Sequence, residues 1–202
     1  MTTAEDLFII ALALGPPDRP VGQGDLSLAL AGAELIDLAA AGALTVDGDR
    51  VVPGPQPALD DRLLGEASSA LARQEPYERV EDWLWRRGRD LSAAYRSALE
   101  EDGRLTRSSR SRSPFGADRV EPADTPSRRR ALNRWEDDEP VLSGLAEAVG
   151  VPGRRTESVP DPEDDVAATV LAAVNDAVME LEAVRQRRSI ESAAFANVWR
   201  GP

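Results

Sequence analysis

The stretch that decides the fold is DLSLALAGAELIDLAAAGALTVDGDRVV, residues 25–52. Its first part predicts a helix with both ends marked, because Asp25 is a suitable N-cap and Gly42 can adopt the left-handed conformation that ends a helix. Apolar residues recur at spacings of three and four. One face of this helix is therefore expected to hold Leu28, Ala31, Leu35 and Leu38, and the other Ser27, Glu34, Asp37 and Ala41.

This helix is rich in leucine and alanine nearly all round, which is typical of a buried element. Gly32 lies at its middle, where a neighbouring helix can approach closely. After Gly42 the pattern changes to that of a strand pair, with residues 44–46 and 50–52 flanking the turn pair Asp47-Gly48. The stretch thus predicts a central buried helix followed by a β-hairpin.

Outward from this stretch, the chain continues to predict helices. Thr2 and Glu5 have the spacing of a capping box, and Thr125-Pro126 is typical of a helix start. A long C-terminal helix opens with acidic residues 161–165, carries an apolar stripe from Val166 to Val184, and ends near Arg188. The other helices are predicted at residues 3–14, 59–73, 80–87, 91–102, 126–135 and 141–149.

We therefore predict a mainly α protein: one helical-bundle domain with a β-hairpin after the central buried helix and a long C-terminal amphipathic helix. The domain is expected to span residues 1–188, with a C-terminal tail at 189–202. Residues 107–113 are arginine- and serine-rich without an apolar face, which predicts a mobile loop. Of the two tryptophans in the helix at 80–87, Trp83 is expected in the core and Trp85 closer to the surface.

Composition limits the chemistry that the chain can perform. The 202 residues include no cysteine and no histidine, so the usual nucleophile–base pairs and the commonest transition-metal ligand are absent. No phosphate-binding loop, dinucleotide fingerprint or nucleophile elbow occurs. Acidic clusters at 136–139 and 163–165 occupy loop or helix-start positions, where solvated caps explain them. We expect no enzyme activity, no catalytic residues, no metal and no cofactor.

Charge is distributed unevenly along the chain. The net charge is −12, yet residues 79–134 hold 14 arginines against 9 acidic residues. A strongly negative total repels nucleic acid and anionic lipid at long range, while the middle third can still present a basic face. No apolar run approaches the length of about 20 residues that a membrane span needs. Any membrane contact is therefore expected to be peripheral.

The order of elements and several short sequences resemble those of the Golgi phosphoprotein 3 family, in a compact bacterial form. The resemblance rests on LAGAELIDLA (30–39), AGAL (41–44), the hairpin, and Asp82-Trp83-Leu84. It covers roughly residues 3–185 and is clearest over the first 105. The resemblance implies a largely helical protein that binds membranes carrying phosphoinositide, and a second hairpin near residue 107.

In the resembled family, a tryptophan before the central helix, an arginine in that helix and two arginines one turn apart on a later helix hold the phosphoinositide head group. Guanidinium groups suit this role because they bind phosphate through two parallel hydrogen bonds. Aligned with this sequence, those four positions fall on Gly22, Ala31, Arg89 and Ser92. Only Arg89 matches, and Arg86 and Arg87 lie nearby. These three arginines are the candidate lipid head-group-binding residues.

The resemblance therefore predicts a non-enzymatic, peripheral membrane adaptor with a largely degenerate site for phosphatidylinositol 4-phosphate. Expected partners are an anionic membrane surface, bound weakly, or the tails of membrane proteins. Two alternatives stay open: a protein–protein interaction scaffold without lipid binding, and a winged-helix nucleic-acid binder. Against the latter stand a pI near 4.6 and the apolar central helix, so no nucleic acid is expected. The expected location is the cytoplasm, with peripheral contact at the inner face of the membrane.

Overall fold

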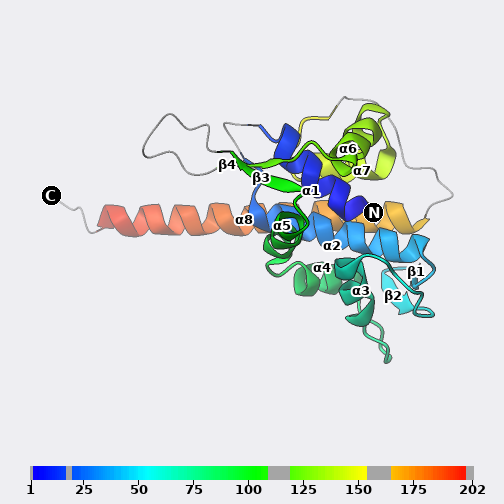
Figure 1. The fold of residues 1–202 in the computed structure, drawn as a ribbon. Helices are drawn as coiled ribbons and strands as arrows, with labels where there is room; N and C mark the ends of the chain where they lie inside the picture. The colour runs from blue at the N-terminus through cyan, green and yellow to red at the C-terminus, as the bar shows by residue number, and fades with distance from the viewer. Residues whose placement is uncertain (1, 17–19, 109–118, 154–164, 199–202) are drawn as a thin grey trace.

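The computed structural model describes residues 2–16, 20–108, 119–153 and 165–198. Within these ranges the chain is mainly helical, with eight helices and two antiparallel strand pairs (Figure 1), which confirms the predicted fold class. The helices are α1 (Thr3–Leu14), α2 (Gln23–Ala40), α3 (Arg62–Ser69), α4 (Val80–Arg87), α5 (Leu91–Glu101), α6 (Pro126–Glu136), α7 (Pro140–Ala148) and α8 (Asp165–Val198).

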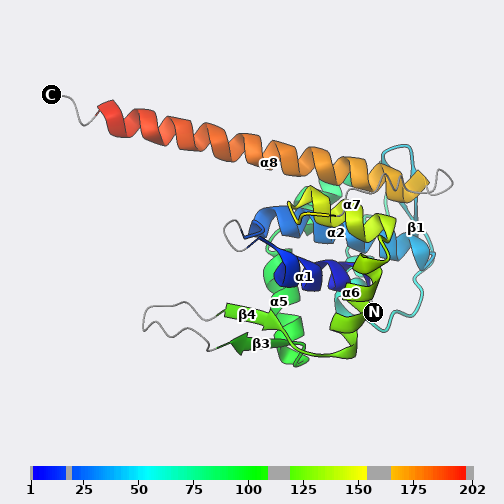
Figure 2. The same ribbon diagram turned by 90° about the horizontal axis from the view of Figure 1, so that it is seen from above.

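Helix α2 lies at the centre of the bundle. It contacts α1, α4, α5, α7 and α8 (Figures 1 and 2), and its residues from Leu26 to Leu35 are all buried. Burial of these leucine and alanine side chains is the main driving force for the fold. The prediction of a central buried helix is confirmed.

The predicted polar face of α2 is wrong. Ser27 and Glu34 are as deeply buried as the leucines, and Asp37 accepts hydrogen bonds from the backbone of Thr3 and Ala4 at the start of α1. The predicted N-cap is also wrong: α2 begins at Gln23 with Gly22 as its N-cap. Asp25 lies in the first turn, and its carboxylate pairs with Arg185 of α8 instead.

The two strand pairs are both short antiparallel hairpins. Strand β1 (Leu44–Asp47) pairs with β2 (Arg50–Pro53), which confirms the predicted hairpin. Asp47 pairs with Arg50, so the two turn residues are Gly48 and Asp49 rather than the predicted Asp47-Gly48. Strand β3 (Leu105–Ser108) pairs with β4 (Arg119–Pro122). The family resemblance implied this second hairpin, whereas the residues themselves predicted a mobile loop at 107–113. Positions 109–113 lie outside the described residues.

Helix α8 packs closely on α2 at Gly32. A Cβ atom built on Gly32 would lie 2.5 Å from Val174 Cγ2 and 3.3 Å from Val170 Cγ1, so only glycine fits between the two helices. Val170, Val174 and Ala177 are buried at this contact, as the apolar stripe predicted. Beyond the body, α8 continues without a break through residue 188, so the tail at 189–202 begins as an extension of the helix (Figure 2).

Candidate anion-binding site

A groove of about 340 Å³ lies where the start of α2 meets the turn between α4 and α5. Leu28, Trp85 and Leu181 form its apolar wall, and Arg89 forms part of its rim. Its polar lining includes Gln23, Ser27, Asp90 and Ser92. The groove therefore combines an indole, a guanidinium and two hydroxyls around the first turns of two helices.

The local sequence explains how the chain makes this groove. Gly88 ends α4, and a Cβ there would lie 2.5 Å from Leu84 O, so the chain can turn closely only with glycine at this position. Asp90 follows with a left-handed backbone, φ 55°, and α5 begins at Leu91. The Ser92 N–H donates to Ser27 Oγ at 3.0 Å, which joins α5 to α2 at the floor of the groove.

Arg89 is the predicted site residue that the structure leaves available. Its side chain is exposed, and no hydrogen bond or ion pair to it occurs within the described part of the chain. The first turn of α2 lies on the same groove, and its positive end already carries the Asp25 carboxylate. A phosphate group would therefore be favoured at this position by the Arg89 guanidinium.

Arg87 points into the protein rather than into the groove. Its guanidinium binds the fully buried Glu34 carboxylate through two hydrogen bonds of 2.8 and 2.9 Å, and it also donates to Leu63 O. The Tyr95 hydroxyl donates to the same carboxylate at 3.2 Å. Burial raises the pKa of Glu34, and Arg87 and Tyr95 oppose that rise. The Arg87 guanidinium therefore pairs with the buried Glu34 carboxylate and does not face the groove.

Arg86 is also occupied, on the outer surface of α4. It makes two hydrogen bonds of 2.7 Å to Glu78 and a third, of 3.1 Å, to Ala70 O. Its guanidinium carbon lies 5.1 Å from the centroid of the Trp83 ring, in a cation–π contact. Trp83 is fully buried, as predicted, and its indole N–H donates to Ala31 O.

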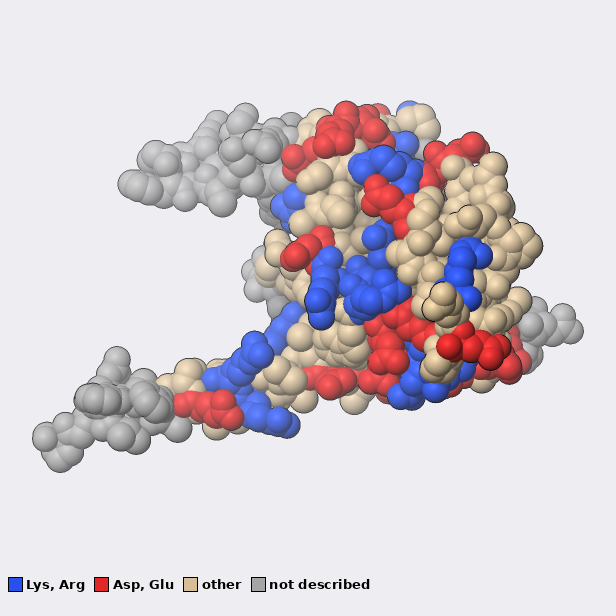
Figure 3. Space-filling model, turned by 90° about the horizontal axis from the view of Figure 1, so that it is seen from below, with Lys and Arg blue, Asp and Glu red and all other residues tan. Residues whose placement is uncertain are grey.

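The structure therefore does not bring Arg86, Arg87 and Arg89 together as one cluster. Of the other two aligned positions on helices, Ala31 is buried and Ser92 lines the groove. On the face of the molecule shown in Figure 3, basic side chains gather in the middle and acidic side chains lie beside them. This face is therefore of mixed sign.

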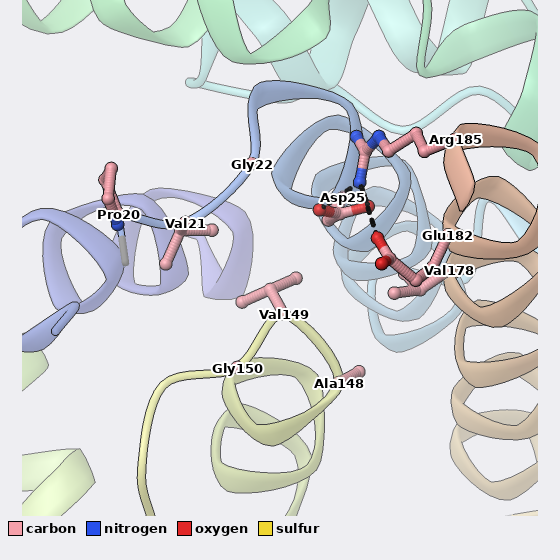
Figure 4. A pocket seen from close by; sticks show the side chains of 10 residues that line it. All are labelled: Pro20, Val21, Gly22, Asp25, Ala148, Val149, Gly150, Val178, Glu182 and Arg185. Carbon is pink, nitrogen blue, oxygen red and sulfur yellow. Dashed lines mark hydrogen bonds and ion pairs between the residues drawn. The ribbon is translucent and has the colours of Figure 1, made fainter. Parts of the chain in front are cut away.

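A second cavity, of about 350 Å³, lies on the other side of the α2 N-terminus. Pro20, Val21, Val149 and Val178 form its apolar wall (Figure 4). Its charged edge is closed by Arg185, whose Nη1 lies 2.7 Å from both Asp25 carboxylate oxygens and 3.7 Å from Glu182. Among the described residues, Arg185 is the one guanidinium that lines this cavity, and it is already paired with acidic side chains. The cavity is therefore less suited to an anion than the Arg89 groove.

The model of one protein family, Golgi phosphoprotein 3 (GPP34), matches residues 4–190. The chain belongs to the Golgi phosphoprotein 3 family. This confirms the resemblance stated from the sequence, and the match covers every helix described here except the first residue of α1 and the end of α8. No curated protein matches the chain at a significant level.

Membership in the Golgi phosphoprotein 3 family was expected together with the mainly helical fold, and the structure has that fold. No helix in the described ranges has the length and hydropathy needed to cross a bilayer. The described residues also include no group of three or more acidic side chains arranged to hold a metal ion.

Several structurally important charges were missed from the sequence. Glu5 and Asp6 are buried at the start of α1; Glu5 pairs with Arg104, and Asp6 pairs with both Arg130 and Arg134. Nothing in the sequence distinguishes these acids from ordinary first-turn residues. Their partners follow them by about a hundred positions or more, so only the fold reveals the pairing.

Proposed function

We propose that this protein is a non-enzymatic, peripheral membrane adaptor that binds phosphate groups on anionic surfaces weakly through the groove at Arg89. The observation that carries the proposal is that Arg89, which forms no ion pair within the described residues, lines the same groove as Trp85. A half-buried indole suits the interface between lipid head groups and acyl chains, and a guanidinium suits the phosphate.

The binding is proposed to lack phosphoinositide preference. Three of the four family contact positions hold Gly22, Ala31 and Ser92, none of which supplies a guanidinium or an indole. A hydrogen bond to a charged group contributes about 1.5–3 kcal/mol, so the loss of two arginine contacts would weaken a specific site by at least about a hundredfold. The remaining attraction is also opposed by the net charge of −12.

The absence of enzyme activity belongs to the same proposal. The sequence has neither cysteine nor histidine, and the groove is lined by one acidic side chain, Asp90, rather than by a carboxylate pair. General acid–base chemistry with carboxylates needs two groups of different pKa in one pocket. The buried α2 also disfavours the nucleic-acid alternative, since no face of it is free to enter a groove of DNA.

The proposal is tested by co-sedimentation of the full chain with phosphatidylcholine vesicles, with and without phosphatidylserine. We expect binding only with phosphatidylserine, and weaker binding at higher ionic strength because salt screens exposed charges. Arg89→Ala should reduce affinity about fivefold, since one arginine near an anionic surface contributes about 1 kcal/mol.

Arg129→Ala is the matched control, because it removes the same charge from an exposed site on α6, on the opposite side of the bundle from α4 (Figure 1). It should bind as the unchanged protein does. Equal losses of vesicle affinity in both variants would show that binding depends on the net charge of the protein and not on the position of Arg89. No binding at low salt would overturn the proposal and favour the protein-scaffold alternative.

A further inference from the structure

Helix α8 has a face that nothing in the described chain covers. The side of the helix that holds Val170, Val174 and Ala177 packs on the body. The opposite side is exposed between residues 168 and 192, and the C-terminal part of the helix projects beyond the body (Figure 2). Residues 186–192 are all exposed. A helical surface of this length without a partner is unusual for a structure stabilised by tertiary packing.

This open face carries an apolar stripe. Met179 and Ile190 are 70% and 69% exposed, the highest values among the large hydrophobic residues described. They are eleven residues apart, three turns of helix, and so lie on the same face. Ala183 and Gln186 lie between them at spacings of four and three, the pattern of a coiled-coil seam.

The edge of the stripe carries opposite charges in a self-complementary order. Glu180 and Arg187 are exposed, lie two turns apart on the same edge, and make no ion pair within the described residues. In an antiparallel pair of identical helices, equivalent edges face each other. With Met179 opposite Ile190 of the second helix, Glu180 of each copy comes within reach of Arg187 of the other.

We infer that a second copy of this chain covers this face, in an antiparallel, two-fold contact between the outer faces of two α8 helices. Each copy contributes Met179, Ala183, Gln186 and Ile190 to the seam, and the Glu180–Arg187 pairs form twice. The body lies on the other side of each helix, so the two bodies do not meet across the seam. The acidic Asp176, Glu180 and Glu182 around the stripe disfavour an anionic membrane as its occupant.

The inference is tested by sedimentation equilibrium of the full chain in buffer without lipid, so its outcome is independent of the Arg89 groove. We expect a concentration-dependent monomer–dimer equilibrium. Glu180→Arg and Arg187→Glu should each raise the dimer dissociation constant about tenfold, because each places like charges at both symmetric pairs. The double variant Glu180→Arg/Arg187→Glu should restore the original constant.

Arg188→Glu is the matched control, since it makes the same charge change one residue further along, away from the stripe. It should leave the dissociation constant unchanged. A chain that stays monomeric at every concentration would overturn the inference. A dimer whose dissociation constant is unchanged in both single variants would also overturn it. The same holds if the double variant does not return the dissociation constant to its original value.

Discussion

Arg86 and Arg87 are neighbours in the sequence, but their side chains face different surroundings. Arg87 is 16% exposed and compensates Glu34, which is fully buried. Arg86 is 45% exposed, and its pair with Glu78 lies near the surface. Removal of one partner from a buried pair leaves a charge that water cannot solvate, whereas an exposed pair contributes little.

We therefore expect Arg87→Ala to lower the free energy of unfolding by about 3 kcal/mol and Arg86→Ala by about 1 kcal/mol or less. Urea denaturation followed by intrinsic tryptophan fluorescence measures both values. Similar losses of unfolding free energy in the two variants would contradict the conclusion that Arg87 pairs with a buried charge and Arg86 with an exposed one. It follows that Arg89→Ala alone is a cleaner test of lipid binding than removal of all three arginines.

The same network makes stability depend on pH. Burial, the largest influence, raises the pKa of Glu34 above its ordinary value. The folded chain therefore holds this proton more tightly than the unfolded chain. The stability that Glu34 contributes is present below the ordinary glutamate pKa, about 4.3, and is lost as the pH rises through the raised value.

Glu34→Gln removes this titration. We expect the free energy of unfolding of the unchanged protein, minus that of the variant, to increase between about pH 7 and about pH 4. Paired urea titrations at the two pH values measure this difference. A difference that stays constant or shrinks on acidification would show that Glu34 does not titrate as its burial implies.

At the residue scale, the sequence predicted the apolar core better than the buried charges. Trp83 was placed correctly because its helical spacing set it on the inner face of α4. Glu34 was assigned to a solvated face because the sequence around a single acidic residue does not reveal a buried partner 53 positions later. Arg89 was found only through the family resemblance, since arginines surround it in the sequence.

Among the elements, the contact between α2 and α8 depends on one glycine. Gly32→Ala would place a Cβ against Val174 at 2.5 Å, which the packed helices can relieve only by moving apart. We expect a loss of about 1–3 kcal/mol in the free energy of unfolding, typical of overpacking a core. Thermal or urea denaturation measures it.

Gly65→Ala is the control for this prediction. Gly65 is also helical, in α3, and a Cβ there meets no atom within 4 Å. Alanine should therefore stabilise the protein by about 0.5–1 kcal/mol, since it restricts the unfolded chain and fits the helix. If Gly32→Ala behaves as Gly65→Ala does, α8 does not pack on α2 as closely as described.

The elements that the sequence predicted correctly are those that carry a signal in their own residues. The β1–β2 hairpin was predicted from the Asp47-Gly48 pair, and α4 from its periodicity and Gly88. Helix α3 was predicted too long, at 59–73: its first residue follows the N-cap Asp61, and it ends before Ala70. Strands β3 and β4 are short and separated by ten residues, so no compact turn pair marks them in the sequence.

For the whole molecule, we propose that the groove at Arg89 attracts anionic surfaces without a preference for phosphoinositide. The family fold is present, while the chain supplies one of the four family contacts and carries a net charge of −12. Charge attraction of this kind depends on the surface charge of the membrane and not on the identity of the head group. It also weakens as salt is added.

The most direct test compares affinity for two sets of vesicles with equal surface charge, one carrying phosphatidylserine and one phosphatidylinositol 4-phosphate, at low and at physiological ionic strength. We expect the same affinity for both sets of vesicles, a lower affinity for both as salt increases, and a still lower affinity in the Arg89→Ala variant. A preference of about tenfold or more for phosphatidylinositol 4-phosphate that persists at physiological salt would contradict this proposal.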